Sequence, residues 1–495
     1  MSRARELGRS VGSTLVSQAL GIVISLAFIA YFGRMLPKAE MAMYAFLFTL
    51  QSWVNLFSGL GLATLAVRDT PALIAGGQRE EAGRLLSSTL WYRTGLGVVV
   101  SAGLVLLAPW LSGRLFGSGD FAFQFSLVAV GGLALSVQNT ASLMQWALQR
   151  FHWRALCDTV ANLATRLLAI VGYFLWGFDG FLAGTIGGAL VTVSVQLWTM
   201  RDMLTLHLLP IGPLMRRSGT YMGSDALRNL MMNLDQPLVG FLLGDAALAD
   251  FFVAKRCHGF FAAALLAVTG PVGAKISEVR LQGAAALTEY FQKALYLVAI
   301  LFIPAGLALV GLSESLLRVL VGSKYVSAAA ILSLYGVVLM VNSTYEIWYE
   351  AVVRLLAGHH AMLQNAVMSL VLYAAYFVFL PLAGPAGIPI SAALAWLAAT
   401  LLAAHLLRRR TGLTCRMGMY LRPLICGLMV LAAVLPSCWL PQTLSVFMIT
   451  IVAAALAYAA GFWLLAPPEV VSLLRRLRAR MIPASPDTGG SGMEP

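Results

Sequence analysis

The sequence predicts an all-α integral membrane protein with about 14 transmembrane helices, arranged as two parallel six-helix lobes followed by two extra C-terminal helices. Three observations support this prediction: the composition, the lengths of the apolar segments and an internal repeat. Of the 495 residues, 59% are hydrophobic and only 11% are charged, and the mean hydropathy is +0.82. Soluble domains average about 25% charged residues, so this composition is typical of a chain that faces lipid.

Apolar segments long enough to cross a bilayer recur along the whole chain. A transmembrane helix needs about 20 predominantly apolar residues. We expect helices at residues 10–33, 41–67, 85–110, 121–148, 155–178, 180–200, 219–243, 247–272, 289–312, 327–355, 361–381, 386–407, 420–436 and 443–465. The first segment follows three arginines, as in a signal peptide, but it is long and lacks a small-x-small cleavage site, so we expect it to be retained.

The distribution of Lys and Arg predicts the orientation. With the N-terminus in the cytoplasm, the cytoplasmic segments hold 24 of the 34 Lys and Arg residues, and the outward loops hold five. Cytoplasmic loops of membrane proteins are enriched in basic residues. We therefore expect both termini to be cytoplasmic. The net charge of +13 follows from this topology, and we expect no nucleic acid as a partner.

An internal repeat predicts the two lobes. GRLFGSGDF at 113–121 resembles LRVLVGSKY at 317–325, and the helix after each copy carries an asparagine, Asn139 in the first and Asn342 in the second. Six spans separate the copies, so the halves share one orientation, with an axis along the membrane normal and a cleft for alternating access. The expected parts are an N-lobe over 1–210, a C-lobe over 211–412, two extra helices over 413–466, and a basic segment with a disordered tail over 467–495.

Charged residues inside the apolar helices mark the expected functional site. A charge at membrane depth is costly and usually faces a partner or a watery cavity. The candidate substrate-binding residues are Arg93, Arg166, Arg228, Lys255, Arg256, Asn139 and Asn342. The candidate ion-coupling residues are Asp235, Glu346 and Asp225.

Asp235 and Lys255 are matched in depth. Asp235 lies ten residues before Asp245, where two helices join, and Lys255 lies ten residues after it. At about 1.5 Å of rise per residue, the two side chains reach similar depths on antiparallel helices. They can therefore pair across the hairpin, either as a structural salt bridge or as a group that titrates.

Spacing places other polar residues on shared helix faces. Asp158, Asn162 and Arg166 recur every four residues, and Arg166 is too deep to reach either interface comfortably, so we expect it to face protein or water. Arg93 lies closer to a helix end, where its side chain can also reach the cytoplasmic interface.

The helix at 327–355 carries Asn342, Glu346, Glu350 and Arg354 along one face. Glu350 and Arg354 are typical of an interfacial ion pair. Glu346 is deeper and lies next to a like charge, so it is a candidate proton or cation site.

The deep charges are mostly basic, which predicts an anionic substrate. A cleft with low-dielectric walls and this excess of Arg and Lys attracts anions, and the Arg fork donates two parallel hydrogen bonds to phosphate oxygens. The five cysteines are scattered without a CxxC or a Cys/His cluster, and no Walker loop or nucleophile constellation occurs. We therefore expect no metal, no cofactor and no catalytic residue.

One segment resembles a known family. LDQPLVGFLLGDAALADFFVAKR at 234–256 is similar to the part of bacterial polysaccharide and O-antigen flippases in which an Asp in the seventh helix precedes a Gly, an aromatic position and an Ala-x-Arg. The corresponding residues here are Asp235, Gly244, Phe252, Ala254 and Arg256. VLVGSKYVSAA at 319–329 and ALQRFHWRAL at 147–156 are also similar, and the resemblance covers about residues 8 to 410 diffusely.

The resemblance implies a flippase of the bacterial inner membrane. Such a protein moves an undecaprenyl-pyrophosphate-linked oligosaccharide to the outer leaflet by alternating access through a cationic cavity, for O-antigen, lipopolysaccharide or exopolysaccharide assembly. The implied partners are this lipid-linked oligosaccharide, membrane lipids, an H⁺ or Na⁺ counter-ion and other polysaccharide-assembly membrane proteins. The wider superfamily, of multidrug, oligosaccharidyl-lipid and polysaccharide exporters, also contains the lipid II flippase and toxin-extrusion-type multidrug antiporters.

Several alternatives fit the sequence less well. The lipid II flippases also have fourteen helices but carry arginines on the first two, and the corresponding segments here, 12–33 and 41–67, have no charge. A multidrug antiporter needs carboxylates to attract cations. A membrane glycosyltransferase needs a long external loop for its catalytic acids, and a major-facilitator transporter has a basic Gly-Asp-Arg loop that residues 68–83 do not match.

Overall fold

Helices form nearly all of the computed structural model, which describes residues 20–21, 23–59, 61–116, 121–148, 150–415, 417–441 and 443–465. Within these ranges the chain contains no strand. A helix satisfies its backbone polar groups internally, which lipid requires because it offers no hydrogen-bonding partners. The predicted all-α membrane fold is confirmed.

The first lobe consists of six spans. It begins with a helix over Val23–Met35, followed by α2 (Lys38–Phe57), α3 (Leu62–Ala75), α4 (Arg79–Phe116), α5 (Ala122–Ala147) and α6 (Phe151–Met200). α2 and α3 are one span bent by 57°. α6 contains two spans, because the backbone at Trp176 and Gly177 is not helical and Gly177 has φ of 61°. The predicted helix start at residue 10 lies outside the described residues.

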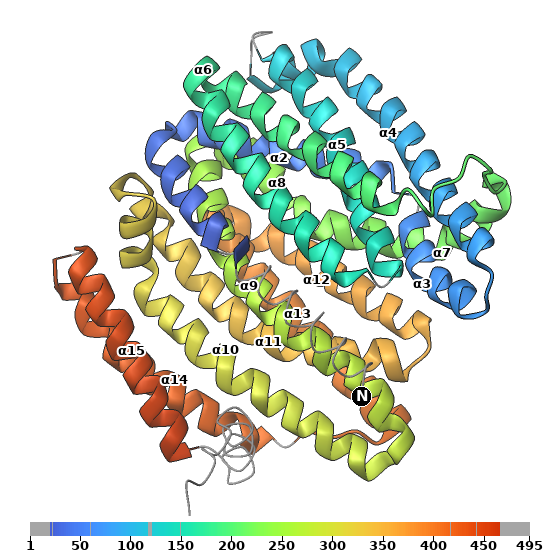
Figure 1. The fold of residues 1–495 in the computed structure, drawn as a ribbon. Coiled ribbons are helices and arrows are strands. Elements are labelled where there is room, and N and C mark those ends of the chain that lie inside the picture. Colours follow the sequence, from blue (N-terminus) through green and yellow to red (C-terminus); the bar gives the residue numbers. More distant parts are fainter. Residues whose placement is uncertain are drawn as a thin grey trace, which may run out of the picture.

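The second lobe and the extra pair follow. Their helices are α7 (Ile211–Asn233), α8 (Asp235–Leu243), α9 (Asp245–Val279), α10 (Ala284–Leu320), α11 (Ala329–Leu355), α12 (Gly358–Ala383), α13 (Gly387–Thr411), α14 (Leu421–Val434) and α15 (Leu444–Leu465). Short 3-10 turns lie at Arg280–Gln282, Ser323–Ala328, Gly384–Ala386, Met417–Tyr420 and Leu435–Trp439. The α14–α15 pair packs against α10 at the edge of this lobe (Figure 1).

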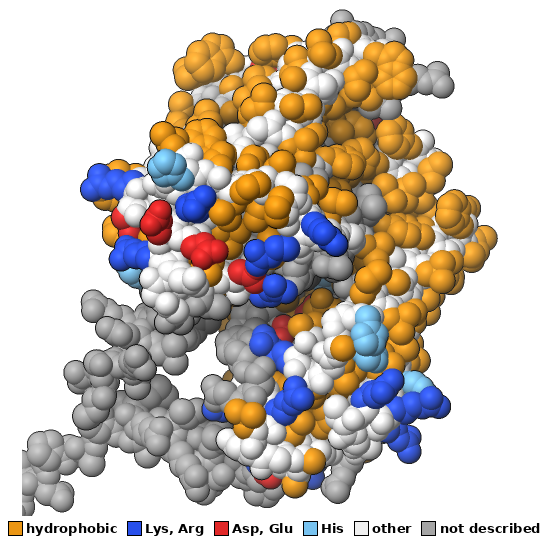
Figure 2. Space-filling view, turned by 90° about the vertical axis from the view of Figure 1, so that its right-hand side faces the viewer, with side chains coloured by type: hydrophobic (Ala, Val, Ile, Leu, Met, Phe, Trp, Pro, Cys, Tyr) orange, Lys and Arg blue, Asp and Glu red, His pale blue; other side chains and the backbone are white. Residues whose placement is uncertain are grey.

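Among the described helices, nine segments are long and apolar enough to cross a membrane, and two of them, over α6 and over α12 with α13, each contain two helices joined by a bend. The bent α2–α3 pair is a tenth candidate span. Val23–Met35 is a shorter apolar helix, and α7 with α8 forms an interrupted helix at the position of the predicted seventh span. In Figure 2 hydrophobic side chains dominate the upper and right-hand parts of the view, and charged side chains gather in its middle and lower parts.

The seventh span is broken, so the prediction of one continuous helix over 219–243 was wrong. α7 ends at Asn233 and α8 begins at Asp235. Pro237 has no backbone N–H, and its ring clashes with the carbonyl four residues earlier, which is that of Asn233. The break places Asp235 in the first turn of α8, where the helix N-terminus stabilises a negative charge. Its Oδ1 accepts a hydrogen bond of 2.8 Å from the Gln236 backbone N–H.

Glycines hold the two halves of α6 in close contact. A Cβ atom added at Gly184 would lie 2.0 Å from the carbonyl oxygen of Leu168, and one added at Gly188 would lie 2.2 Å from the Cα of Thr165. Small residues at such positions let helix backbones approach closely. This contact fixes the helix turn that carries Arg166 against the second half of α6.

We expect Gly188→Ala to destabilise the protein, because its methyl group collides with backbone atoms that have no room to move. Overpacking of this kind costs about 1–3 kcal/mol in free energy of unfolding. The matched control is Gly187→Ala, whose methyl group meets only the Leu168 Cδ1 at an ordinary 3.6 Å. The apparent melting temperature of the full-length protein in lipid nanodiscs measures the difference, and equal values for the two variants would contradict the glycine contact.

Candidate functional site

A cavity of about 870 Å³ lies between the two lobes. The first helix, α2, α5 and both halves of α6 line it from the first lobe, and the end of α7, α8 and α9 line it from the second. Ligand pockets in proteins typically measure about 300–1,000 Å³. The cavity is therefore large enough for a ligand of several linked groups.

The charged residues that line the cavity are mostly basic. They are Arg166, Lys255 and Arg256, with Asp158 as the one acidic residue in the described lining. Arg166 comes from the first lobe, and the other two basic residues come from α9 of the second. The structure thus brings basic side chains from both halves to one chamber, as the sequence analysis expected.

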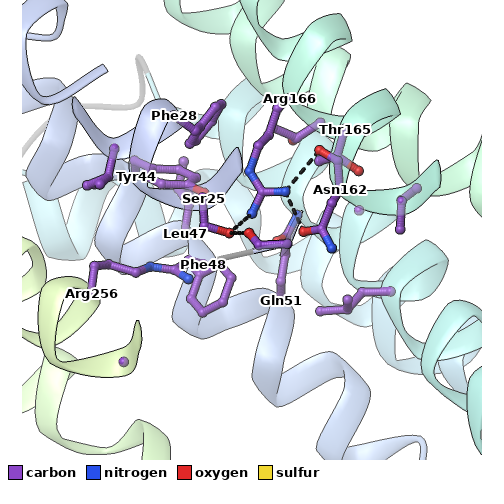
Figure 3. A pocket seen from close by; sticks show the side chains of 18 of the residues that line it. Ser25, Phe28, Tyr44, Leu47, Phe48, Gln51, Asn162, Thr165, Arg166 and Arg256 are labelled. Carbon is purple, nitrogen blue, oxygen red and sulfur yellow. Dashed lines mark hydrogen bonds between the residues drawn. The ribbon is translucent and has the colours of Figure 1, made fainter. Parts of the chain in front are cut away.

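Among the described residues, neutral groups hold Arg166 in place. Its guanidinium donates hydrogen bonds to the Asn162 carbonyl oxygen at 2.9 Å, to the Asn162 side-chain oxygen, and to the Ser25 Oγ at 2.5 Å. Its Cζ also lies 5.5 Å from the ring centre of Phe28. Figure 3 shows these contacts around the guanidinium. The side chain is therefore fixed in position but keeps its full positive charge.

Aromatic rings hold Arg256. Its Cζ lies 4.1 Å from the ring centre of Phe48 and 5.0 Å from that of Phe252, which are cation–π distances. In the part of the chain that the structure describes, no hydrogen-bond acceptor or carboxylate contacts this guanidinium. Arg256 reaches toward the cavity from α9, across from Arg166 on α6 (Figure 3).

Lys255 differs from the two arginines because a carboxylate neutralises it. Its Nζ lies 2.8 Å from Oδ1 and 2.6 Å from Oδ2 of Asp235, so the ion pair predicted from matched depth forms. Lys255 lines the cavity, whereas Asp235 is only 5% exposed and is not part of the lining. Asp158 lies 3.7 Å from Arg154, which leaves Arg166 and Arg256 as the two lining charges without a carboxylate partner among the described residues.

Packed aromatic side chains close one end of the cavity. Phe32 and Phe181, both buried, have ring centres 4.7 Å apart. Tyr44 packs edge-on against Phe181 at 5.0 Å and against Phe252 at 5.5 Å. We call these four residues the aromatic layer. It separates the cavity from the loop that joins the first helix to α2.

Polar contacts join the lobes just beyond the aromatic layer. Lys38 Nζ lies 2.7 Å from Oδ1 of Asp250, and Ser327 Oγ donates to Oδ2 of the same carboxylate at 2.6 Å. Lys324 donates to two backbone carbonyls of the first lobe, and Arg34 donates to two backbone carbonyls of the second. We call Arg34, Lys38, Asp250, Lys324 and Ser327 the polar lock.

Besides Asp235, four of the predicted site residues do not line this cavity: Arg93, Asn139, Asn342 and Glu346. Arg93 is 5% exposed and donates to the Asn55 Oδ1 at 3.2 Å. Asn139 follows the lining residue Gln138 on α5 but is not itself in the wall. Asn342 and Glu346 lie in α11, which contributes nothing to the described lining.

The two other predicted residues, Arg228 and Asp225, lie in α7, and their side chains fall outside the described residues. The predicted interfacial pair of α11 is confirmed, since Arg354 Nε lies 2.8 Å from Oε2 of Glu350.

The sequence analysis missed much of the neutral lining, including Ser25, Tyr44, Phe48, Gln51 and Gln138. The two glutamines carry a usable signal, because an amide inside an apolar membrane helix needs a polar neighbour. The aromatic residues carry none, since lipid-facing and cavity-facing rings look alike in sequence.

A comparison with known sequences and structures adds two findings. The sequence model of a family described as "Polysaccharide biosynthesis protein" matches residues 7–277. Among curated protein sequences, none matches this chain.

Several solved structures share the fold over most of the chain. The lipid II flippase MurJ in an inward closed conformation has a TM-score of 0.71 at 17% identity, covering 94% of this chain and 98% of its own. A point mutant of the MATE transporter VcmN from Vibrio cholerae has a TM-score of 0.63 at 17% sequence identity. The match covers 85% of this chain and 100% of that transporter. A MOP superfamily transporter from Pyrococcus furiosus has a TM-score of 0.62 at 14% sequence identity. The match covers 81% of this chain and 94% of that transporter. At these identities the likeness shows the fold alone.

We expect two neighbouring substitutions to differ in their effect on stability. Lys255→Met leaves the Asp235 carboxylate buried without its partner and costs about 3 kcal/mol in free energy of unfolding. Arg256→Met removes only cation–π contacts, which contribute about 1 kcal/mol or less. Thermal unfolding of each full-length variant in nanodiscs measures this. An Arg256→Met variant as unstable as Lys255→Met would show that Arg256 has an anionic partner in the protein.

Proposed function

We propose a function for this chain from one premise: it belongs to the polysaccharide biosynthesis protein family. The chain is also a multi-pass membrane protein with the fold of the MOP superfamily transporters. The proposed function is that of a flippase. It would move an undecaprenyl-pyrophosphate-linked oligosaccharide from the cytoplasmic to the outer leaflet of the bacterial inner membrane, for assembly of a cell-surface polysaccharide.

One observation carries this proposal: two guanidinium groups face the same interlobe cavity without carboxylate partners in the described chain. A cation inside a membrane protein is costly unless an anion or water compensates it. A diphosphate fits this need, because its oxygens accept paired hydrogen bonds from Arg and its charge matches two guanidinium groups. Arg166 and Arg256 are therefore the proposed diphosphate ligands.

The neutral lining suits the glycan part of the substrate. Gln51, Gln138 and Asn162 offer amide groups, which both donate and accept hydrogen bonds, as sugar hydroxyl groups do. Tyr44 and Phe48 offer aromatic faces beside them. Specificity for a particular glycan would then come from many modest contacts and not from one charged group.

The polar lock and the aromatic layer support alternating access. They close the cavity at the end that the positive-inside rule assigns to the outer side. The lock joins the lobes through side chains and through carbonyls at helix ends and in the loop after the first helix, so these contacts can break without unfolding any helix. We assign this structure to the state closed toward the outside, with both termini in the cytoplasm.

The proposed coupling ion is H⁺ or Na⁺. Asp235 is the best placed of the candidate carboxylates, since its ion pair with Lys255 borders the cavity. Glu346 and Asp225 stay candidates on the sequence argument. Membrane lipids and other membrane proteins of polysaccharide assembly are the proposed partners.

Lipid II flipping is the second candidate, because the MurJ structure covers 94% of this chain. Lipid II also carries a diphosphate, so the basic cavity suits either substrate. A multidrug antiporter is disfavoured, since the one carboxylate in the described lining, Asp158, has Arg154 nearby. Depleting the protein and identifying which lipid-linked precursor accumulates distinguishes the candidates.

We expect Arg166→Ala and Arg256→Ala, each alone, to slow translocation strongly while the protein stays in the membrane. Losing one charge-assisted contact to the diphosphate costs about 2 kcal/mol or more, which lowers the rate by about 30-fold. The measurement is the appearance of the lipid-linked glycan on the outer face of reconstituted vesicles. Arg318→Ala is the matched control, because Arg318 pairs with Glu314 and is not part of the described cavity lining. Normal translocation in both cavity variants would overturn the proposal.

We expect Asp250→Ala to open the cavity to the outside more often. The substitution removes two contacts to one carboxylate, and hydrogen bonds to charged groups contribute about 1.5–3 kcal/mol each. A single cysteine at Gln138, in a cysteine-free background, should react about tenfold faster with an impermeant maleimide added outside. Asp245→Ala, an exposed position earlier on α9, is the control, and unchanged labelling in Asp250→Ala would show that the polar lock does not close the cavity.

A further inference from the structure

The two sides of the Asp235–Lys255 ion pair face different surroundings. Lys255 is part of the cavity wall and its side chain is 26% exposed, whereas the side chain of Asp235 is 6% exposed and lies behind that wall. The ammonium group contacts both carboxylate oxygens, at 2.6 and 2.8 Å. A single bond rotation in the long Lys side chain can change which neighbour its Nζ contacts, and Asp235 has no such freedom.

We propose that this ion pair is a substrate-operated latch: an anion bound by Arg166 and Arg256 competes with Asp235 for the Lys255 ammonium group. In the empty cavity Asp235 holds Lys255. When a diphosphate occupies the cavity, Lys255 becomes its third basic ligand and the ion pair opens. This inference rests on the proposed function, because it requires an anionic substrate in the cavity.

Groups other than Lys255 also stabilise the charge of the Asp235 carboxylate. It lies in the first turn of α8, where the helix dipole favours a negative charge, and it accepts the Gln236 N–H. A carboxylate stabilised in this way can release Lys255 at a lower cost than one that depends on the ion pair alone.

Other titratable groups surround the pair. His258 lies one turn after Lys255 on α9 and stacks on Tyr335 of α11, with ring centres 4.6 Å apart. Tyr335 and the α12 phenols Tyr373 and Tyr376 lie within electrostatic range of Asp235. Once Lys255 leaves, these phenols remain within electrostatic range of the Asp235 carboxylate.

The latch is linked to the polar lock through α9. Asp250 of the lock lies five residues before Lys255, and Phe252 of the aromatic layer lies between them on the same helix. Opening of the latch frees this segment of α9 from α8. A movement of α9 then acts on the contacts that close the outer end of the cavity.

Inorganic pyrophosphate binding to the full-length protein in nanodiscs tests the latch. Asp235→Asn removes the carboxylate that competes with the anion for Lys255, so the affinity for pyrophosphate should rise about tenfold. Lys255→Gln should lower the affinity, and the double variant should match Lys255→Gln. Glu314→Gln, which removes the acidic partner of an exposed ion pair, is the control and should leave the affinity unchanged.

An exchange of the two charges separates a latch from a merely structural ion pair. The variant Asp235→Lys with Lys255→Asp keeps the pair but puts the carboxylate in the cavity wall. We expect it to recover the melting temperature lost in Lys255→Gln and to lose pyrophosphate binding. Recovery of both stability and binding would overturn the latch.

The outcomes also separate the latch from the proposed function. If Arg166→Gln weakens pyrophosphate binding and Asp235→Asn does not change it, the anion cavity stands and the latch is overturned. If pyrophosphate does not bind to the wild-type protein or to Asp235→Asn, both are overturned. A tenfold gain in Asp235→Asn that disappears in the double variant supports both.

Discussion

The cost of keeping a positive charge in a membrane without a carboxylate partner shapes the centre of this protein. Neutral acceptors and one ring hold Arg166, and two rings hold Arg256. Such contacts orient a guanidinium but do not neutralise it. The fold tolerates this because the two charges border a cavity of about 870 Å³, and because close glycine contacts in α6 leave Arg166 in one position.

Helix α9 connects the separate parts of the site. Within seven residues it supplies Asp250 to the polar lock, Phe252 to the aromatic layer, and Lys255 and Arg256 to the cavity. A helix is stiff over two turns, so these groups move together. A displacement of α9 therefore changes its contacts with α2 and its contacts with α8 at the same time. Helix α9 can thus couple the binding of a ligand in the cavity to the opening or closing of the outer end of the cavity.

The spans and part of the site were predictable from the sequence. The residues that were wrongly placed in the cavity share one cause. The apolar runs predicted the helices, and depth matching predicted the Asp235–Lys255 pair, because both depend on local spacing. Pro237 also indicates the break before Asp235, which the predicted helix over 219–243 did not include. Which helix face turns toward the cavity was not predictable, since a membrane helix is apolar on all sides and packs without a hydrophobic stripe. Arg93, Asn139, Asn342 and Glu346 were therefore assigned to a cavity that they do not line. The polar lock joins residues more than 200 positions apart, and no local pattern marks it.

Whether the cavity binds a cationic or an anionic substrate depends more on which of its charged residues are paired than on how many there are. Asp235 lies behind the cavity wall, and the ammonium group of the lining residue Lys255 already contacts both of its oxygens. A cationic substrate would have to displace Lys255, whose effective concentration at Asp235 is high because both belong to one folded chain. An anionic substrate instead meets two guanidinium groups that no described carboxylate neutralises, and it gains Lys255 as it binds. The same ion pair therefore disfavours cations in the empty state and adds a ligand for anions in the occupied state.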